Sequence, residues 1–242
     1  PTDTDCAPFL DSLWTRYAPA QYRPDHYAQM AELFTLAHDR LNSPHCRWLN
    51  YGGILLTELD QYPQLHDLYL PRLPALETAL PPNSTDLATA YNYYGIALGE
   101  LGRYADALAY AQKALSIQQA ELPADSVELA YSYNNVGTAQ GCLGDYHTAL
   151  ENQLKAHQIL KKALPLDHPD LVKSCNHVST TYNDLGLHDQ ALEYNQMALD
   201  ICNRALSPEH PLLASAYDSA GLTHGYLGHY QQALKYHQLA LD

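Results

Sequence analysis

Thirteen histidines and five cysteines are the side chains of this sequence that could ligate a metal ion or act as a base or nucleophile. His224, His229 and His237 come closest to a metal-binding pattern, because two of them flank a predicted turn and the third follows two helical turns later. A zinc centre there needs a further ligand and groups that orient the imidazoles. The sequence contains no Gly-x-Ser-x-Gly elbow, no His-Glu-x-x-His pair and no dinucleotide fingerprint. We therefore predict no catalytic residue, no metal site, no cofactor and no enzymatic activity.

The cysteines point to a reducing compartment. Their number is odd, and no two of them form a Cys-x-x-Cys pair. A disulfide framework and a cysteine zinc site are both disfavoured by that pattern, so the cysteines are predicted to be small buried hydrophobic residues of a cytoplasmic protein. No run approaches the roughly 20 apolar residues of a membrane span, and no cleavable signal opens the chain. Because the chain begins at Pro1, we expect it to be part of a longer protein.

A column of asparagines is the sharpest functional signal. Asn50, Asn92, Asn134 and Asn176 recur every 42 residues, and Asp218 ends the series. Asparagine is a mediocre helix former, because its amide competes for backbone hydrogen bonds. A carboxamide offers donors and an acceptor, which suits holding the backbone of an extended peptide. The alternative is that these amides bond to the neighbouring repeat, and a residue of such a column can do both.

Repeated helix pairs are the elements that must position this column. Glycine, leucine and alanine columns share its 42-residue step: Gly102, Gly144, Gly186 and Gly228; Leu87, Leu129, Leu171 and Leu213; Ala107, Ala149, Ala191 and Ala233. Apolar residues at helical spacing predict two helices in each unit. The repeated glycine between them is expected to end the first helix in the left-handed conformation.

The starts of the first helices carry their own signals. Asp125 and Asp167 are predicted to cap two of them, because a carboxylate accepts hydrogen bonds from the free N–H groups of a first turn. Pro169 falls in such a turn, where proline is tolerated. His168 and His210 belong to the preceding linkers, and we interpret them as turn residues.

The periodicity also divides the chain. Residues 87–242 are predicted to hold four repeats, the last of them shortened, and residues 45–86 a degenerate copy. Residues 1–44 fall outside the register and are expected to form an N-terminal helical cap, which repeat arrays need for solubility. Three prolines are expected to shorten or break the second helix of the degenerate copy: Pro63, Pro71 and Pro74.

Several segments resemble the kinesin light chain variant of the tetratricopeptide repeat. They are Tyr133-Asn134-Asn135-Val136-Gly137, Leu143-Gly144-Asp145-Tyr146, Leu166-Asp167-His168-Pro169 and Pro208-Glu209-His210-Pro211. The resemblance implies an all-α, right-handed superhelical solenoid of antiparallel helix pairs. Its concave wall is lined by first helices and holds a peptide or helix of a partner. The stretch Tyr69-Leu70-Pro71-Arg72-Leu73-Pro74 is similar to the junction before the sensor arms of bacterial signal-transduction ATPases. This chain has no phosphate-binding loop, so any ATPase module lies outside it.

The same resemblance implies which residues line the groove. The expected contacts are Asn92, Asn134, Asn176 and Asp218, flanked by Tyr131, Thr138, Lys173, Thr180 and Asn183. Three further glycines, Gly99, Gly141 and Gly225, fall inside predicted first helices. They are hypothesised to keep the groove floor low for a partner backbone, or else to relieve crowding between adjacent units.

Charge narrows the choice of partner. The formal charge is −14, and the 13 Lys and Arg residues are scattered, which argues against nucleic acid. The kinesin light chain groove is basic and takes acidic peptides, whereas this groove offers Lys173 against Asp218, Glu100 and Asp184. We expect a neutral to mildly basic protein or peptide partner and no membrane association. The sequence thus predicts a protein-interaction scaffold, the recognition arm of a larger protein. The alternative is a self-assembly module that associates through exposed ends of the array.

Overall fold

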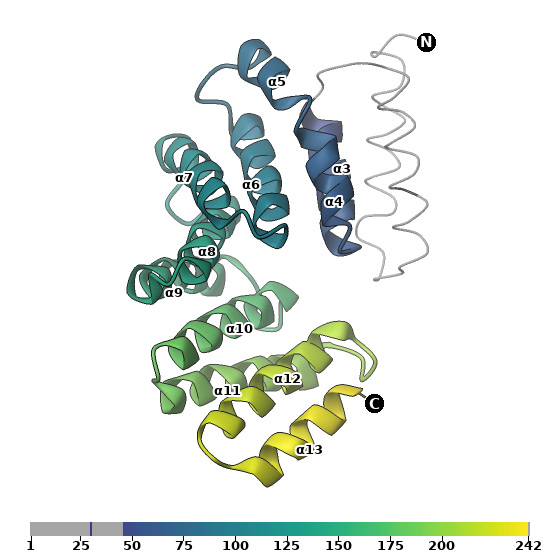
Figure 1. The fold of residues 1–242 in the computed structure, drawn as a ribbon, viewed down its shortest axis with the longest axis vertical. Coiled ribbons are helices and arrows are strands. Elements are labelled where there is room, and N and C mark those ends of the chain that lie inside the picture. The colour runs from purple at the N-terminus through teal and green to yellow at the C-terminus, as the bar shows by residue number, and fades with distance from the viewer. Residues whose placement is uncertain (1–29, 31–45, 242) are drawn as a thin grey trace. The chain divides into compact units, whose positions relative to one another are not determined.

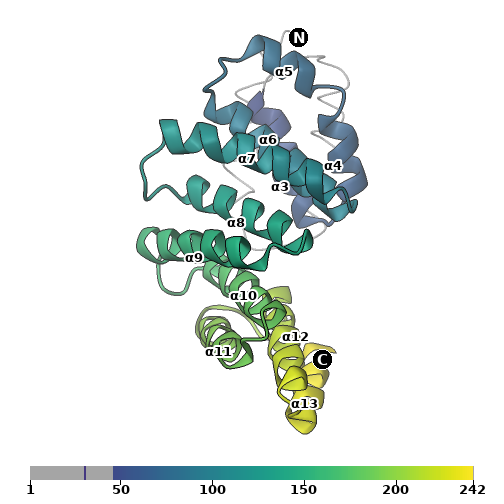
Figure 2. The same cartoon turned by 60° about the vertical axis from the view of Figure 1, so that its left-hand side comes forward.

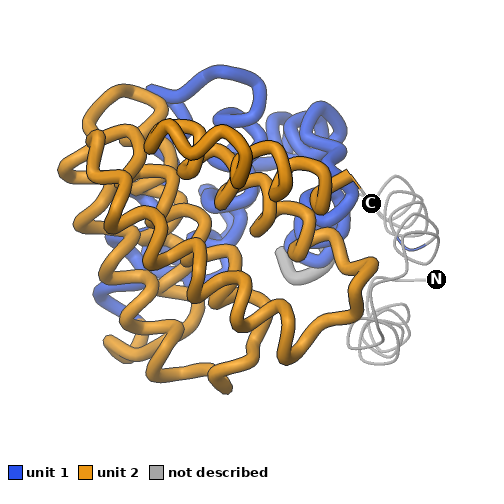
Figure 3. Tube along the Cα trace, turned by 90° about the horizontal axis from the view of Figure 1, so that it is seen from below, with its two compact units in different colours: residues 1–121 blue, residues 122–242 orange. Residues whose placement is uncertain are grey.

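The computed structural model describes Met30 and residues 46–241, and this part of the chain is helical without strands (Figure 1). The cap predicted for residues 1–44 lies outside the described residues, apart from Met30. The chain divides into two compact units, unit 1 (residues 1–121) and unit 2 (residues 122–242), which are coloured separately in Figure 3. None of the described helices is long and apolar enough to cross a membrane.

Most of the described helices come in consecutive pairs. Unit 1 contains α3 (Cys46–Glu58), α4 (Tyr62–Tyr69), α5 (Leu73–Ala79), α6 (Thr85–Glu100) and α7 (Tyr104–Glu121). Unit 2 contains α8 (Val127–Cys142), α9 (Tyr146–Ala163), α10 (Pro169–Asp184), α11 (His188–Ala205), α12 (Pro211–Tyr226) and α13 (Tyr230–Leu241). The predicted all-α architecture of packed helix pairs is confirmed.

The turn inside each of the last four pairs is set by its glycine. Gly102, Gly144, Gly186 and Gly228 have φ angles of 77°, 86°, 73° and 76°. An L-residue with a Cβ atom is strained in this left-handed region, whereas glycine is not. The expectation from the glycine column is therefore confirmed.

Helix starts differ from the sequence prediction. The N-cap positions of α8 and α10 are Ser126 and His168, so the prediction of Asp125 and Asp167 is wrong by one position in both cases; the Ser126 side chain makes no capping hydrogen bond. His168 and His210 are caps rather than plain turn residues: each accepts, through Nδ1, the backbone N–H two residues ahead at 3.2 Å. A neutral imidazole with a free Nδ1 thus replaces the usual side-chain oxygen of an N-cap.

The region of residues 45–86 shows the effect of its prolines. Its second helix is divided into α4 and α5, with Pro63 and Pro74 in their first turns and Pro71 between them. This division matches the prediction of a shortened or broken helix. Tyr69 at the end of α4 is fully buried, and its hydroxyl donates to the carbonyl oxygen of Leu49 at 3.1 Å, which fixes α4 against α3.

Unit 2 is layered by helix type. Each first helix (α8, α10, α12) packs against the second helix that follows it, and α9 and α11 also pack against the next first helix. The first helices contact one another as well, α8 with α10 and α10 with α12 (Figure 2). We call these three helices the first-helix layer of unit 2. The second helices α9, α11 and α13 form the other layer, which we call the second-helix layer.

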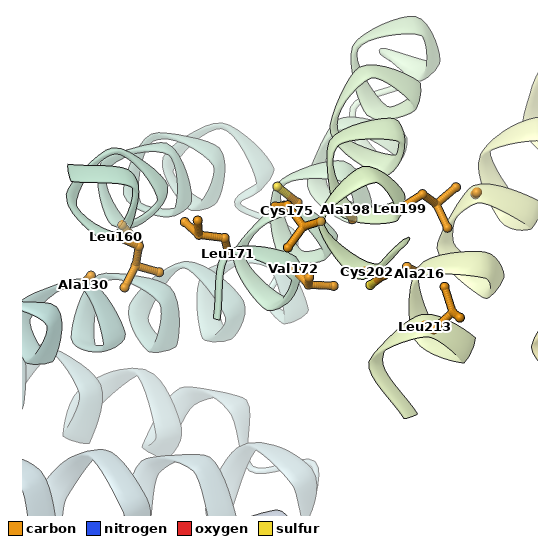
Figure 4. Packing of buried hydrophobic residues seen from close by; sticks show 13 residues of the cluster. Ala130, Leu160, Leu171, Val172, Cys175, Ala198, Leu199, Cys202, Leu213 and Ala216 are labelled. Atoms are coloured by element: carbon orange, nitrogen blue, oxygen red, sulfur yellow. The ribbon is translucent and has the colours of Figure 1, made fainter. Parts of the chain in front are cut away.

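Alanine columns let these layers approach. Ala130, Ala156, Ala198 and Ala216 are fully buried in one apolar cluster that runs from α8 to α12. Leu160 and Val172 belong to the same cluster and are labelled in Figure 4. Small side chains at the contacts and large ones between them give the close packing typical of protein interiors.

Candidate functional site

The asparagine column lies on the first helices but is less open than the sequence suggested. Asn92 on α6 and Asn134 on α8 each keep only 7% of their surface exposed. Asn176 on α10 is half-buried, and Asp218 on α12 is exposed. Asn92 belongs to unit 1, whereas the other three lie in unit 2.

Two amides of the column bond to the following repeat. Asn176 donates from Nδ2 to Oγ of Ser215 on α12 at 3.2 Å. Asn50 likewise donates to the carbonyl oxygen of Asp86, at the start of α6, at 3.3 Å. The alternative reading of the column, as a link between neighbouring repeats, is therefore confirmed for these two residues.

The carboxamide oxygens of the column in unit 2 remain unused. Within the described part of the chain, three buried side-chain atoms have no hydrogen-bond partner: Oδ1 of Asn134, Oδ1 of Asn176 and Nδ1 of His177. All three belong to α8 and α10. An unpaired buried polar atom costs about 1–3 kcal/mol. Burial, reinforced by Lys173, lowers the pKa of His177 and keeps its imidazole neutral.

The flanking residues predicted from the sequence are mostly accessible. Thr138 on α8 and Lys173 and Thr180 on α10 are exposed, and Tyr131 on α8 is 40% exposed. The Tyr131 hydroxyl donates to the carboxylate of Asp170 at the start of α10. These side chains lie on α8 and α10, the same two helices that carry Asn134 and Asn176.

Asn183 and Asp218 serve mainly structural contacts. Asn183 is half-buried and donates to Oγ1 of Thr223 on α12 at 2.8 Å. Oδ1 of Asp218 lies 2.9 Å from Nδ1 of His237 on α13, the second helix of the same repeat. The aspartate therefore does not repeat the local arrangement of Asn134 and Asn176.

A buried polar network behind the first-helix layer was missed by the sequence reasoning. Asn195 on α11 is fully buried and donates to Oγ1 of Thr223 at 2.6 Å. Gln153 on α9 accepts a hydrogen bond from Oγ1 of Thr181 at 2.7 Å. These two residues precede Asn195 and Thr223 by 42 residues each, so the same contact recurs in the preceding repeat. The recurrence of a polar residue inside an otherwise apolar helix face was the signal that could have revealed this network.

The interior glycines fall into two groups. A Cβ atom on Gly137 would lie 2.9 Å from the carbonyl oxygen of Ala149, so this glycine permits the close approach of α8 and α9. A Cβ atom on Gly141 would lie 3.9 Å from the nearest neighbour outside its own turn, and one on Gly225 would meet nothing within 4 Å. Crowding between adjacent repeats therefore does not explain Gly141 or Gly225.

The histidines singled out in the sequence do not gather into one cluster. His224 and His229 have Nδ1 atoms 3.4 Å apart at the turn between α12 and α13, while His237 contacts Asp218. The described residues contain no group of three or more His, Cys, Asp or Glu side chains arranged to hold a metal ion.

Comparison with known proteins supplies the family. The family model described as "Tetratricopeptide repeat" matches residues 86–162 and 174–242. A comparison with curated proteins finds no significant match.

Three solved structures illustrate the likeness. The TPR-like repeats of a protein described as a kinesin light chain from Podosopora anserina are 17% identical, with a TM-score of 0.66 over 81% of this chain and 93% of that chain. BtubC (BKLC) from P. vanneervenii is 17% identical, with a TM-score of 0.65 over 90% of this chain and 87% of that chain. The apo form of RapI is 15% identical, with a TM-score of 0.57 over 86% of this chain and 57% of that chain. At these identities the likeness concerns the fold.

Proposed function

The chain belongs to the tetratricopeptide repeat family and is a scaffold for protein–protein interaction, and from this premise we propose that unit 2 holds an extended peptide segment of its partner. The segment lies along the first-helix layer, with Asn134 and Asn176 as its main contacts. No catalytic step is part of this function.

The unpaired carboxamide oxygens support the proposal most directly. Oδ1 of Asn134 and Oδ1 of Asn176 are buried acceptors without a donor in the described part of the chain. Backbone N–H groups of an extended peptide are donors of the required kind, and they recur along any sequence. Such contacts relieve the cost of the two unpaired atoms while reading little of the partner's sequence.

The contact of Asn176 with Ser215 fits this role. It occupies the amide nitrogen of Asn176 and leaves the oxygen free, so one residue can link two repeats and still accept from a ligand. The side chain is thereby held in one orientation before the ligand arrives, which lowers the entropy cost of binding.

Charge on the first-helix layer favours a neutral to mildly basic segment. Lys173 is the cation among the proposed contacts, while Asp170 and Asp218 contribute carboxylates on the same layer. Tyr131, Thr138 and Thr180 add hydroxyl groups that bond equally well to neutral peptide groups.

Selection followed by calorimetry tests this proposal. A library of random 12-residue peptides is screened against the chain, and the Kd of the selected peptides is measured for the Asn134→Ala/Asn176→Ala double variant. We expect at least a tenfold higher Kd for the double variant. Asn203→Ala, an exposed asparagine on α11, is the matched control and leaves the Kd unchanged. Selected peptides that bind the double variant as well as the parent chain, or a library without any binder, would refute the proposal.

We further propose that the repeats are the recognition arm of a larger cytoplasmic protein. The free, buried thiols of Cys175 and Cys202 support a reducing compartment. The sequence that flanks this chain in its parent protein tests the arm: a nucleotide-binding module upstream supports a sensor role, and a coiled coil supports a cargo adaptor.

Self-association is a second candidate function, and exposed apolar side chains on α12 and α13 favour it. Tyr226, Tyr230 and Leu234 are 60%, 75% and 60% exposed. Large apolar side chains with this exposure on one helix pair are candidates for contacts with another chain. Light scattering over a range of concentrations distinguishes the two functions, since a monomer at every concentration rejects assembly.

A further inference from the structure

Unit 2 has a small cavity between its second helices α9 and α11, and neither Asn134 nor Asn176 lines it. One wall is formed by His157 and Lys161 of α9, and the other by residues of α11 that end with Arg204. Its volume is about 150 Å³. A cavity of about that size accommodates a group as large as benzene.

The floor of this cavity is apolar and its rim is cationic. Leu171 and Ile201 are buried and Met197 is half-buried, so they form the floor, whereas Lys161, Arg204 and the apolar Leu166 are exposed and form the rim. Neither of the two cations forms an ion pair with any residue that the structure describes. Their place in the last turns of α9 and α11 complements the helix dipoles. The dipoles do not account for an apolar hollow between the two cations.

One further rim group is an anion. Asp200 lines the same cavity, and its Oδ1 accepts a hydrogen bond from Nε2 of Gln196 at 2.8 Å. Two cations therefore face one carboxylate, and the cavity carries net positive charge within a chain of formal charge −14.

His157 gives the cavity an internal reporter. Its Nδ1 lies 2.8 Å from Oγ of Ser174, whose own hydrogen points to the carbonyl oxygen of Leu171 at 3.0 Å. When the Ser174 hydroxyl donates to Leu171, Nδ1 of His157 is the donor to Oγ, and Nε2 is then the basic nitrogen. Burial, with Lys161 next, lowers the pKa of His157. An anion in the cavity would shift that pKa upward, because it favours the charged imidazolium.

The same design recurs one repeat earlier in unit 2. A second hollow is lined by Leu129, Ile159 and Lys162, which precede Leu171, Ile201 and Arg204 by 42 residues each. The consecutive residues Lys161 and Lys162 thus serve neighbouring hollows. Apolar sites with a cation at the same rim position, repeated along one layer, suit an extended chain better than a single small molecule.

We propose that the cavity between α9 and α11 is a second docking site, which takes a partner segment carrying a leucine-sized apolar side chain next to a carboxylate. The apolar side chain fills the hollow over Leu171 and Ile201, and the carboxylate meets Lys161 and Arg204. This site is independent of the peptide contacts proposed for Asn134 and Asn176.

A defined peptide probes the site. Acetyl-Ala-Glu-Leu-Glu-Leu-Ala-amide is titrated into the chain at low salt, with the Kd measured by calorimetry and the Cε1 proton of His157 followed by NMR. Two comparison probes separate the contributions: the same peptide with Gln in place of Glu, and hexanoate as a free apolar acid. We expect the glutamate peptide to bind at least tenfold more tightly than either. Its Kd should rise with ionic strength, because exposed charges are screened, and the apparent pKa of His157 should rise on binding.

Variants of the rim localise the effect. Lys161→Gln and Arg204→Gln are each expected to raise the Kd threefold or more, and Asp200→Asn to lower it. Lys235→Gln removes the same charge from α13 and is the matched control, which should leave the Kd unchanged. The Asn134→Ala/Asn176→Ala variant should bind this peptide normally, so a failure of one site is distinguishable from a failure of the other.

Four outcomes would overturn the proposal. Equal binding of the glutamine peptide removes the role of the charge, and absence of binding at 1 mM removes the site itself. Equal or tighter binding of hexanoate makes the cavity a small-molecule site. A loss of affinity in Lys235→Gln as large as in Arg204→Gln shows a general effect of net charge.

Discussion

Two glycines of α8, four residues apart, should respond differently to replacement by alanine: one variant should gain stability and the other should not. A Cβ atom on Gly137 would lie 2.8 Å from Cγ of Gln153 and 2.9 Å from the carbonyl oxygen of Ala149. The second contact involves backbone, so α9 would have to move. A Cβ atom on Gly141 would lie 3.9 Å from Cβ of Ala149, an ordinary van der Waals contact.

The magnitudes follow from two opposing effects. Replacing glycine by alanine inside a helix stabilises it by about 1 kcal/mol. Overpacking a tight contact costs about 1–3 kcal/mol. Gly141→Ala gains the first effect alone, so it should raise the free energy of unfolding by about 1 kcal/mol. Gly137→Ala has both effects, so it should lie about 1–3 kcal/mol below Gly141→Ala, and at or below the parent chain.

Thermal and urea unfolding of the whole chain measure the difference. For a chain of this size a change of 1 kcal/mol moves Tm by about 2–4 °C, so the two variants should be separated by at least that interval. Gly99→Ala in unit 1 is the control for an uncrowded glycine, because its Cβ atom would lie 3.8 Å from Cβ of Ala107.

The comparison can refute the reasoning cleanly. Helix propensity contributes equally to Gly137→Ala and Gly141→Ala, so it cancels in their difference. If Gly137→Ala is as stable as Gly141→Ala, the close approach of α8 and α9 imposes no steric demand. If Gly141→Ala is destabilised instead, that residue has a packing role that its surroundings do not show.

Three further predictions concern the interior of unit 2. Replacing Asn195 by Ala should lower the free energy of unfolding by about 1–3 kcal/mol, because Thr223 and its neighbours lose buried partners. In that variant, Thr223→Val should lower the free energy of unfolding by less than it does in the parent chain. A double-mutant cycle measured by urea unfolding will show the difference. Because the pKa of His157 is lowered in the folded chain, the unfolded chain binds this proton first as the pH falls below the usual histidine value. The free energy of unfolding should therefore drop as the pH falls through that region. Unfolding at a series of pH values should show a smaller dependence on pH for His157→Gln. Burial raises the pKa of the Cys175 thiol to about 12. A thiol reagent should therefore modify exposed Cys142 rapidly and Cys175 only after unfolding, as peptide mapping of the labelled chain will show. Equal rates of labelling would contradict the burial of Cys175.

Local signals in the sequence were enough to predict the conformation of the repeated glycines and the helix break at the prolines. The positive φ of Gly144 follows from its place between two apolar periodicities, and the break at Pro71 follows from the chemistry of the residue itself. The cap at His168 did not follow, because a carboxylate at Asp167 was the stronger local candidate. Only the path of the linker decides which of two adjacent residues reaches the free N–H groups.

The candidate sites were likewise predicted in part from the sequence and in part only from the tertiary structure. The sequence by itself placed Asn134 and Asn176 on equivalent helix faces, because a 42-residue period carries every residue of one repeat to the same position in the next. It could not say that their oxygens lack partners, nor that Lys161 and Arg204 share the rim of one cavity. Burial, pairing and cavities arise where residues about 40 positions apart meet across packed helices. The tertiary structure alone decides which polar atoms find a partner there and which are left without one.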